Sequence, residues 1–346
     1  MTIKVGIIGA GQIVRIRHLP EVVNNPDATL AGICDINPER VSELAEQYHC
    51  QAFTDYKEMI QQPDIDAIVV AATNKLHAAM TIDALNAGKH VLCEKPIATS
   101  LEDAKRMLET AKKTGKQLMI GNNQRLEVSH QKAREILASG RLGKVLTFRT
   151  TFGHPGSEDW AAEGLNTWFY KKDIAGLGVL GDLAVHKLDL IRWLIDDEYT
   201  EVSAFADTLS KTYPDGTLID VEDNAVSILR TQKGAIGTLA ASWSYAQENN
   251  STTIYCQNGV MEIYTDPEFP LAIHFNHTQG EYYQLGKKST NVEQLSSGVM
   301  DAFISALVAG EPVAITGEDG YKALEAVLAL QKSVETGRVI SIPMEG

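Results

Sequence analysis

The fold of this chain is decided by the stretch Ile3-Lys4-Val5-Gly6-Ile7-Ile8-Gly9-Ala10-Gly11-Gln12-Ile13-Val14. Its apolar first half predicts a buried strand, and the glycines predict a tight turn into a helix. Gly9 permits the turn, and Gly11 lets the main chain approach the pyrophosphate of a dinucleotide. We assign Gln12 and Ile13, at the positive end of the helix, to the same site. An ordinary strand–helix turn without a ligand is the alternative.

The third position of this fingerprint should be Gly or Ala, because strand and helix pack closely there. The chain has Val14 instead, so we expect the helix to lie slightly off the strand.

Asp35 strengthens the dinucleotide interpretation. It ends the second strand, 24 residues after Gly11, where a carboxylate accepts hydrogen bonds from ribose hydroxyls. Its charge repels a 2′-phosphate, so the sequence favours NAD over NADP, although Arg40 lies close enough to leave some room for NADP. Asp35 has an alternative role as the cap of the helix that begins near Pro38, and both roles could coexist.

Strands and helices alternate through the first third of the chain. Strands are expected over 3–8, 30–34, 65–70, 90–93 and 117–120, and helices over 12–25, 38–48, 75–87 and 100–114. Ser100 begins a capping box, and Gly88 and Gly115 stand where helices should stop. This order predicts an α/β fold with a doubly wound parallel (Rossmann) sheet over residues 1–121, whose ligand lies at the carboxyl ends of the strands.

The pattern changes after residue 121. Helices are expected over 127–138, 183–195, 295–309 and 320–336, and the short strands between them are typical of antiparallel hairpins. We therefore predict a second, α+β domain over residues 122–346, built on an open, mostly antiparallel sheet. One face of such a sheet still has to be buried, so we expect that face to form the interface of a homodimer or homotetramer.

Composition excludes several functions. The formal charge is −14, with 45 acidic and 31 basic residues, and no basic stripe suits nucleic acid. The four cysteines are scattered without zinc spacing, which favours idle thiols in a reducing compartment and no metal site. No segment approaches the roughly 20 apolar residues of a membrane span. We expect a cytoplasmic protein that binds a small molecule.

Two later blocks carry a resemblance to a known family. Ala71-Ala72-Thr73-Asn74-Lys75-Leu76-His77 precedes Ala87-Gly88-Lys89-His90-Val91-Leu92-Cys93-Glu94-Lys95-Pro96, and Gly176-Leu177-Gly178-Val179-Leu180-Gly181-Asp182-Leu183-Ala184-Val185-His186-Lys187-Leu188-Asp189 follows in the second domain. Over nearly the whole chain the order of motifs resembles the glucose–fructose oxidoreductase/inositol dehydrogenase (Gfo/Idh/MocA) family, its inositol 2-dehydrogenase-like members in particular.

The resemblance implies a dehydrogenase that transfers a hydride between NAD(H) and a secondary hydroxyl of a cyclic polyol or sugar, such as inositol or a monosaccharide. It also implies that Thr73, Asn74 and His77 border the cofactor, and that the Lys95–Pro96 peptide bond is cis. We assign Thr73, Asn74 and Glu94 to the cofactor site.

Lys95, Asp182 and His186 are the predicted catalytic residues. Lys95 follows a buried strand and can exchange a proton with a substrate hydroxyl; a snorkelling surface lysine is the alternative. Asp182 and His186 are four residues apart and share one face of a helix. A largely neutral imidazole can accept the alcohol proton, and Asp182 can orient it or hold a neighbouring hydroxyl. Alternatively, Asp182 caps its helix and His186 is a satisfied buried histidine.

Asn123, Arg125 and Trp168 are the expected substrate contacts, because amide, guanidinium and indole groups suit a hydroxylated ring. Two other functions fit the same fold: NAD-dependent glycoside hydrolysis, and a non-catalytic sensor that binds dinucleotide. Sensors of this kind generally lose the lysine or the histidine, and both are present here.

Overall fold

Strand β1 (Ile3–Ile8) lies inside a six-stranded parallel sheet of order β3-β2-β1-β4-β5-β6 in this computed structural model. The structure describes residues 2–161, 163–276, 279–286 and 296–344. The other strands of the sheet are β2 (Ala28–Cys34), β3 (Gln51–Phe53), β4 (Ala67–Val70), β5 (His90–Cys93) and β6 (Leu118–Ile120). Their pairings are all parallel, which confirms the predicted doubly wound sheet.

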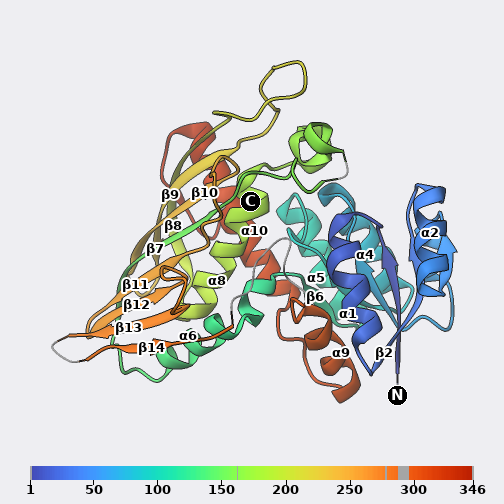
Figure 1. Cartoon of the computed structure of the whole chain (residues 1–346), viewed down its shortest axis with the longest axis horizontal. Helices are drawn as coiled ribbons and strands as arrows, with labels where there is room; N and C mark the ends of the chain where they lie inside the picture. The colour runs from blue at the N-terminus through green and yellow to red at the C-terminus, as the bar shows by residue number, and fades with distance from the viewer. Residues whose placement is uncertain (1, 162, 277–278, 287–295, 345–346) are drawn as a thin grey trace. The chain divides into compact units, whose positions relative to one another are not determined.

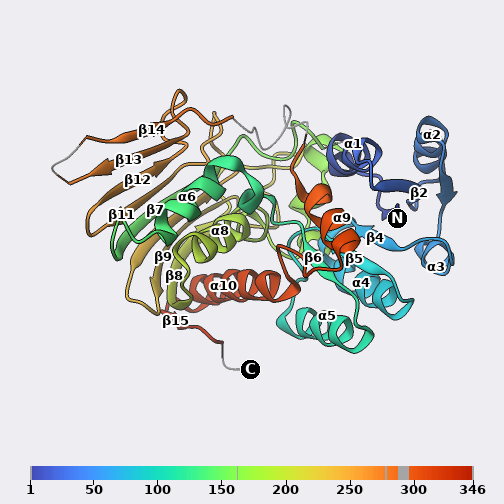
Figure 2. The same ribbon diagram turned by 90° about the horizontal axis from the view of Figure 1, so that it is seen from below.

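Helices cover both faces of this sheet, with α1 on one face and α4 and α5 on the other (Figure 2). Their bounds are α1 (Leu19–Asn24), α2 (Pro38–Tyr48), α3 (Tyr56–Ile60), α4 (His77–Asn86) and α5 (Leu101–Thr114), with the 3₁₀ turn η2 (Asn74–Leu76) before α4. Ser100 caps α5 by accepting the N–H of Asp103, as the capping box predicted. Strand β3 and helix α3 were not predicted, because each is too short to show a period.

A nine-stranded sheet of order β14-β13-β12-β11-β7-β10-β9-β8-β15 forms the second half of the described chain (Figure 1). Its strands are β7 (Val145–Gly153), β8 (Tyr199–Asp207), β9 (Asn224–Thr231), β10 (Ile236–Ser242), β11 (Thr252–Cys256), β12 (Gly259–Ile263), β13 (Leu271–Phe275), β14 (Glu281–Tyr283) and β15 (Ile340–Ser341). Only β7 and β10 pair in parallel within this sheet as described, so the predicted mostly antiparallel sheet is confirmed.

Helices α6 (Val128–Ala138), α8 (Val185–Ile195) and α10 (Gly317–Thr336) lie along one face of this sheet (Figure 2). Short turns η3 (Asn123–Leu126), η4 (Gly164–Asn166), η5 (Trp168–Tyr170) and α7 (Lys172–Ala175) precede α8. Among the described residues, no helix has both the length and the apolar character needed to cross a membrane.

The chain divides into two compact units. The first contains the parallel sheet and, in addition, residues 296–321 with helix α9 (Val299–Ala309). The sequence analysis assigned those residues to the second domain; position 295, where it began this helix, lies outside the described residues. Glu21 of α1 explains the attachment, because its carboxylate accepts the N–H groups of Ser297 and Met300 at the start of α9. The second unit contains residues 124–286 and 322–344 as far as they are described.

Candidate active site

Four predicted site residues follow four neighbouring strands of the first unit. Gly9 comes after β1, Asp35 after β2, Thr73 after β4 and Glu94 after β5. Because these strands are parallel and adjacent in the order β2-β1-β4-β5, their carboxyl ends share one edge of the sheet. The structure therefore gathers the first-domain candidates at the edge where a doubly wound sheet binds its ligand.

The loop after β1 has the form that a bound pyrophosphate needs. Gly9 has φ +104°, and a Cβ there would lie 2.3 Å from the carbonyl oxygen of Ala71, so only glycine fits. A Cβ on Gly11 would meet nothing within 4 Å, which means that open space lies above this exposed residue. These two observations fit a dinucleotide, whose phosphates would occupy the space that the missing side chain leaves.

The helix that follows begins in an unusual way. Val14–His18 form the π-helical turn η1, and the N–H of Leu19 reaches back to the carbonyl of Val14. A π-turn carries one extra residue and is locally wider, so it provides room for the fully buried Val14 at the position where Gly or Ala is usual. No side chain caps η1 and no acidic residue lies in its first turn, which leaves its positive end available to an anion.

Asp35 is hydrogen-bonded to the glycine loop. Its Oδ2 accepts the N–H of Ala10 at 2.8 Å, and its Oδ1 accepts the N–H of Asn37 at 2.9 Å. The alternative role as a helix cap is wrong, because Asn37 caps α2 by accepting the N–H of Arg40. Arg40 also lies 3.9 Å from the Asp35 carboxylate. Since each carboxylate oxygen can accept more than one hydrogen bond, Asp35 can hold the loop and a ribose hydroxyl together.

Glu94 is buried beside a histidine that the sequence analysis did not consider. Its Oε1 lies 2.8 Å from Nε2 of His18 in η1, and its Oε2 accepts the main-chain N–H of Lys95 at 3.2 Å. Burial alone would raise the pKa of Glu94, but the hydrogen bond from His18 and the charges of Arg17 and Lys95 lower it to about 2. Glu94 is therefore a permanent negative charge that fixes the start of the Lys95 turn.

Lys95 is half-buried at the carboxyl end of β5, and its bond to Pro96 is cis, as the resemblance implied. The buried His77 braces this turn: its Nδ1 lies 2.7 Å from the carbonyl oxygen of Pro96, and its Nε2 lies 3.0 Å from that of Ala72. Burial lowers the pKa of His77, against the raising effect of its contacts with these two carbonyl groups and of Glu94. His77 thereby links the loop after β4 to the loop after β5.

Thr73 and Asn74 occupy the first of these two loops. Thr73 precedes η2 in an extended conformation and is half-buried, whereas Asn74 begins η2 and is buried. Gly9 packs against Ala71 and Ala72 at the start of this loop, so the loop that holds Thr73 and Asn74 begins beside the glycine loop.

In the second unit, Asp182 does not cap its helix. It lies inside the π-helical turn η6 (Leu180–Ala184), whose N-terminal cap position is Val179. The buried Asp182 carboxylate accepts a hydrogen bond at 3.0 Å from the indole N–H of Trp243, a fully buried residue directly after β10. Capping is therefore the wrong explanation for this residue.

His186 follows on α8 and is also buried. Its ring packs edge-on against Phe152 near the end of β7, with ring centroids 5.7 Å apart. Phe152 pairs with Ala241 of β10, two residues before Trp243. The partners of Asp182 and His186 thus belong to the ends of two paired strands, which brings the two candidates to one end of this sheet.

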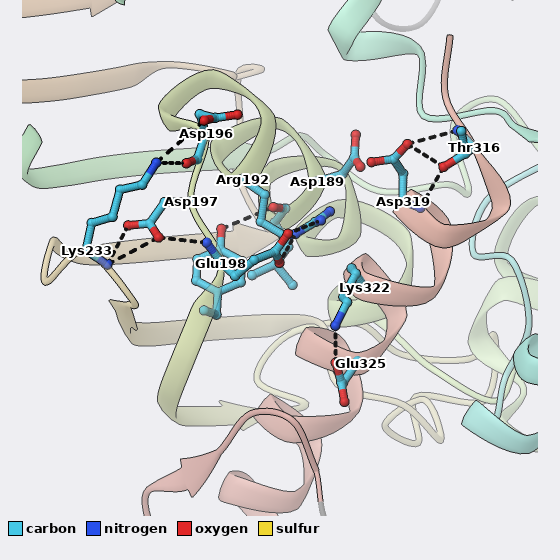
Figure 3. Close-up of polar contacts among 12 residues, drawn as sticks. Asp189, Arg192, Asp196, Asp197, Glu198, Lys233, Thr316, Asp319, Lys322 and Glu325 are labelled. Carbon is cyan, nitrogen blue, oxygen red and sulfur yellow. Dashed lines mark hydrogen bonds and ion pairs between the residues drawn. The ribbon is translucent and has the colours of Figure 1, made fainter. Parts of the chain in front are cut away.

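Arg125 forms a buried ion pair with α8. Its Nε donates to Oδ2 of Asp189 at 2.7 Å and a second guanidinium nitrogen contacts Oδ1, with both side chains buried. Asp189 lies on the face of α8 that carries His186. At the other end of the helix, Arg192 pairs with both oxygens of Glu198 (Figure 3). Two bidentate ion pairs therefore hold the helix that bears His186, one near its middle and one near its end.

The remaining expected substrate contacts differ in exposure. Asn123 is buried at the start of η3. Trp168 is half-buried in η5, where its ring stacks on Phe169 with centroids 4.0 Å apart.

Sequence reasoning missed His18 and Trp243, which contact Glu94 and Asp182. Neither belongs to a motif, since each meets its partner 76 or 61 residues away in the chain. A histidine about two helical turns after a glycine loop was the available signal for His18. Within the described residues, no group of three His, Cys, Asp or Glu side chains could hold a metal ion.

A Rossmann unit with a dinucleotide loop, joined to an open sheet whose helix carries a buried acid and an imidazole, defines a two-domain nicotinamide oxidoreductase. Comparison with known proteins agrees: residues 3–122 match the model of the "Oxidoreductase family, NAD-binding Rossmann fold", and residues 130–262 match the "GFO/IDH/MocA C-terminal domain". The chain belongs to the Gfo/Idh/MocA oxidoreductase family.

Three relatives illustrate this similarity. Myo-inositol 2-dehydrogenase of Thermotoga maritima is 30% identical, covering 98% of each chain. 1,5-Anhydro-D-fructose reductase of Ensifer adhaerens is 28% identical, covering 97% of this chain and 98% of the other. Among solved structures, levoglucosan dehydrogenase in complex with NADH has a TM-score of 0.90 and 25% identity over the full length of both chains.

Proposed function

We propose that this protein is an NAD(H)-dependent dehydrogenase acting on a secondary hydroxyl of a cyclic polyol or sugar. The observation that carries the proposal is the edge of the parallel sheet, where the glycine loop, Asp35 and the Glu94-Lys95-Pro96 turn lie together. A dinucleotide loop and a braced lysine on one edge suit hydride transfer next to a proton-transfer group. Relatives named for inositol, levoglucosan and 1,5-anhydro-D-fructose support a cyclic substrate.

Each candidate catalytic residue has one role in this proposal. When bound, the nicotinamide supplies the acceptor for the carbon-bound hydrogen. His186 accepts the proton of the substrate hydroxyl as the carbonyl forms, and Lys95 donates a hydrogen bond to that oxygen and stabilises its developing charge. Asp182, held by the indole of Trp243, orients the imidazole or a neighbouring hydroxyl. That Lys95 and His186 act on the same oxygen stays a prediction.

The cofactor contacts follow from the loop geometry. We assign the pyrophosphate to the open space at Gly11 and to the helix start at Gln12 and Ile13. Asp35 would accept the ribose hydroxyls and repel a 2′-phosphate, so we propose NAD rather than NADP. Thr73 and Asn74 border the nicotinamide half.

The expected substrate contacts divide into two groups. Asn123 and Trp168 keep their proposed roles as a hydroxyl partner and a ring-stacking surface. Because Asp189 holds the guanidinium of Arg125, we propose that Arg125 positions α8 and reaches substrate only indirectly.

The open sheet also supports a homo-oligomer. Its strands expose a row of apolar side chains, including Phe205, Val226 and Ile228, which are 86%, 59% and 56% exposed. Phe205 and Val226 are direct cross-strand partners on β8 and β9. Contiguous exposed apolar area of this kind is typical of a protein interface, so we propose a homodimer or homotetramer that buries it.

A direct absorbance assay for NAD(P)H tests the proposed function. The full chain is incubated with NAD⁺ or NADP⁺ and each of several inositols, levoglucosan and monosaccharides, and NAD(P)H formation is followed. We expect NADH with at least one cyclic polyol and a marked preference for NAD⁺. Failure of every substrate, together with no measurable NADH binding, would contradict the proposal.

The same assay separates the alternatives. Net NADH formation from a free polyol excludes transient oxidation during glycoside hydrolysis, and turnover excludes a pure sensor. The relatives are named as dehydrogenases and reductases, which does not favour either alternative. We place the enzyme in the cytoplasm, where its four free cysteines would stay reduced.

A further inference from the structure

Glu222 holds the segment that leads into the Asp182 turn. Its Oε1 accepts the N–H of Gly178 at 3.0 Å and the N–H of Leu180 at 3.2 Å. Its main-chain carbonyl accepts the N–H of Val179 at 2.9 Å. Three successive N–H groups at the entry to the turn are thus satisfied by one residue from a distant part of the chain.

Close packing at Gly178 makes this contact specific. A Cβ on Gly178 would lie 2.2 Å from the carbonyl oxygen of Glu222, so any larger residue would push the two segments apart. No side chain of its own segment caps η6. Because the N–H groups at the start of a helical turn have no partner within it, the Glu222 carboxylate supplies the missing cap from outside.

The next residue, Asp223, holds the other side of Asp182. Its carbonyl accepts the main-chain N–H of Trp243 at 2.9 Å, and the indole of Trp243 donates to Asp182. The Asp223 carboxylate accepts the N–H groups of three successive residues, which anchors the dipeptide itself; these are Leu209, Ser210 and Lys211. Glu222 and Asp223 therefore connect to Asp182 along two routes, through its own helix and through its hydrogen-bond donor.

We infer that Glu222 is a positioning residue for Asp182, and that it sets turnover by fixing the π-turn η6. This inference rests on the proposed function, in which Asp182 acts in catalysis. Reacting groups need placement to within a fraction of an ångström, and a misplacement of about 1 Å can cost about a hundredfold in rate. Release of the N–H groups of Gly178 and Leu180 would let η6 relax toward a regular helical turn and shift Asp182 along its axis.

Glu222 also lines a pocket of about 170 Å³. The other charged groups of that pocket are Lys172, Asp207 and Asp220. Burial raises the pKa of Glu222, against the lowering effect of its N–H donors and of Lys172. Protonation of Glu222 would weaken the cap, since a neutral acid accepts hydrogen bonds less strongly than a carboxylate.

Variants of the full-length enzyme test the inference by steady-state kinetics. Glu222→Ala removes the acceptor, and we expect kcat to fall about tenfold or more while KM for NAD⁺ stays within about twofold, because the dinucleotide loop belongs to the first unit. Glu222→Gln keeps a carbonyl acceptor for both N–H groups, so it should recover kcat to within about threefold of the wild type. Asp220→Ala removes a carboxylate from the same pocket and is the matched control.

Each result either supports or overturns the inference. A Glu222→Ala enzyme with the kcat of the Asp220→Ala control overturns the inference, and so does a Glu222→Gln enzyme as impaired as Glu222→Ala. If Glu222→Ala does not fold, Glu222→Asp decides: its carboxylate is one methylene too short to reach both N–H groups, so wild-type kcat in that variant also overturns it.

The kinetics of Asp182→Asn, measured in parallel, distinguish a failure of this inference from a failure of the proposed function. Full turnover by Asp182→Asn removes Asp182 from catalysis and the inference with it, while the dehydrogenase activity stands. Absence of NAD⁺ reduction by the wild type is a different result and overturns the proposed function itself.

Discussion

Nε2 of His18 lies 2.8 Å from Oε1 of Glu94, and both side chains are buried. This contact joins the π-turn after the glycine loop to the Glu-Lys-Pro turn. The other Glu94 oxygen accepts the N–H of Lys95, so the turn after the glycine loop and the candidate catalytic lysine contact one carboxylate. This buried pair helps to fix the spacing between them.

Loss of His18 should therefore destabilise the first unit. His18→Ala leaves the buried Glu94 carboxylate without its closest donor, and we expect a loss of at least about 2 kcal/mol in the free energy of unfolding. Glu94→Gln and the double variant complete a cycle that isolates the pair, measured by denaturant titration. Strictly additive losses would show that the pair does not couple the two turns.

The same pair gives a pH dependence with a defined sign. The pKa of Glu94 is about 2 in the folded protein and 4.5 ordinarily, so its stabilisation is present above 4.5 and is lost as pH falls toward 2. The stability difference between the wild type and Glu94→Gln should narrow between about pH 5 and about pH 3. A difference that stays constant over that range contradicts the assignment.

Lys187 predicts a second dependence of stability on pH, which arises from a buried amine and not from a buried carboxylate. It is fully buried next to His186, and its ammonium donates to the carbonyl of Asn250 at 2.9 Å. Burial lowers its pKa from 10.5 to about 7, against the raising effect of Glu127 and Glu248. The unfolded chain then binds more protons than the folded one between these two values, so this group makes stability rise with pH there.

The expected slope is about 1.4 kcal/mol per pH unit from this group alone. Unfolding free energies measured from about pH 7.5 to about pH 8, above the folded pKa of Lys187 and below the ordinary pKa of cysteine and tyrosine, should show it. Lys187→Met should lack this slope. Parallel curves for the variant and the wild type would show that Lys187 keeps its ordinary pKa.

Lys95 and His186 should act as a unit in turnover. Lys95→Met and His186→Asn should each lower kcat by about 10²- to 10⁴-fold, while NAD⁺ affinity changes only severalfold. The double variant should be no worse than the more impaired single one, because both groups serve one proton transfer. Lys113→Met, at an exposed position near the end of α5, is the control and should behave as the wild type. Unchanged turnover in either single variant removes that residue from the mechanism.

Coenzyme choice should depend on Asp35. Asp35→Ser removes the charge that repels a 2′-phosphate and releases Arg40, now 3.9 Å away, to bind it. The ratio of kcat/KM for NADP⁺ to that for NAD⁺ should rise about tenfold or more, equivalent to about 1.4 kcal/mol. Addition of Arg40→Ala should cancel most of the gain. A ratio that does not move would show that the phosphate lies elsewhere.

The exposed sheet face should determine the oligomeric state. Phe205→Lys places a charge among apolar neighbours and should lower the mass measured by light scattering. Val23→Lys changes an exposed apolar residue on α1 of the first unit and serves as the control. If both variants keep the mass of the wild type, this face is not the interface.

The sequence by itself determined most elements of the first unit, apart from β3 and α3, and the edge of its sheet where the candidate residues lie. The apolar strands, the glycine-containing turn and the Ser100 cap can be recognised from residues close together in the chain, whereas the contact of Asp35 with Ala10 spans 25 residues. The order of strands and helices then allowed a doubly wound sheet, since right-handed crossovers leave few other arrangements. The resemblance in the later motifs added the family.

Only the tertiary structure decided what holds the candidate residues in place. His18 with Glu94, Trp243 with Asp182, Arg125 with Asp189 and Glu222 with Gly178 are partners between 44 and 76 residues apart. The return of residues 296–321 to the first unit is of the same kind. A periodic pattern reports which face of an element is buried, but it carries no record of which distant group is buried against that face.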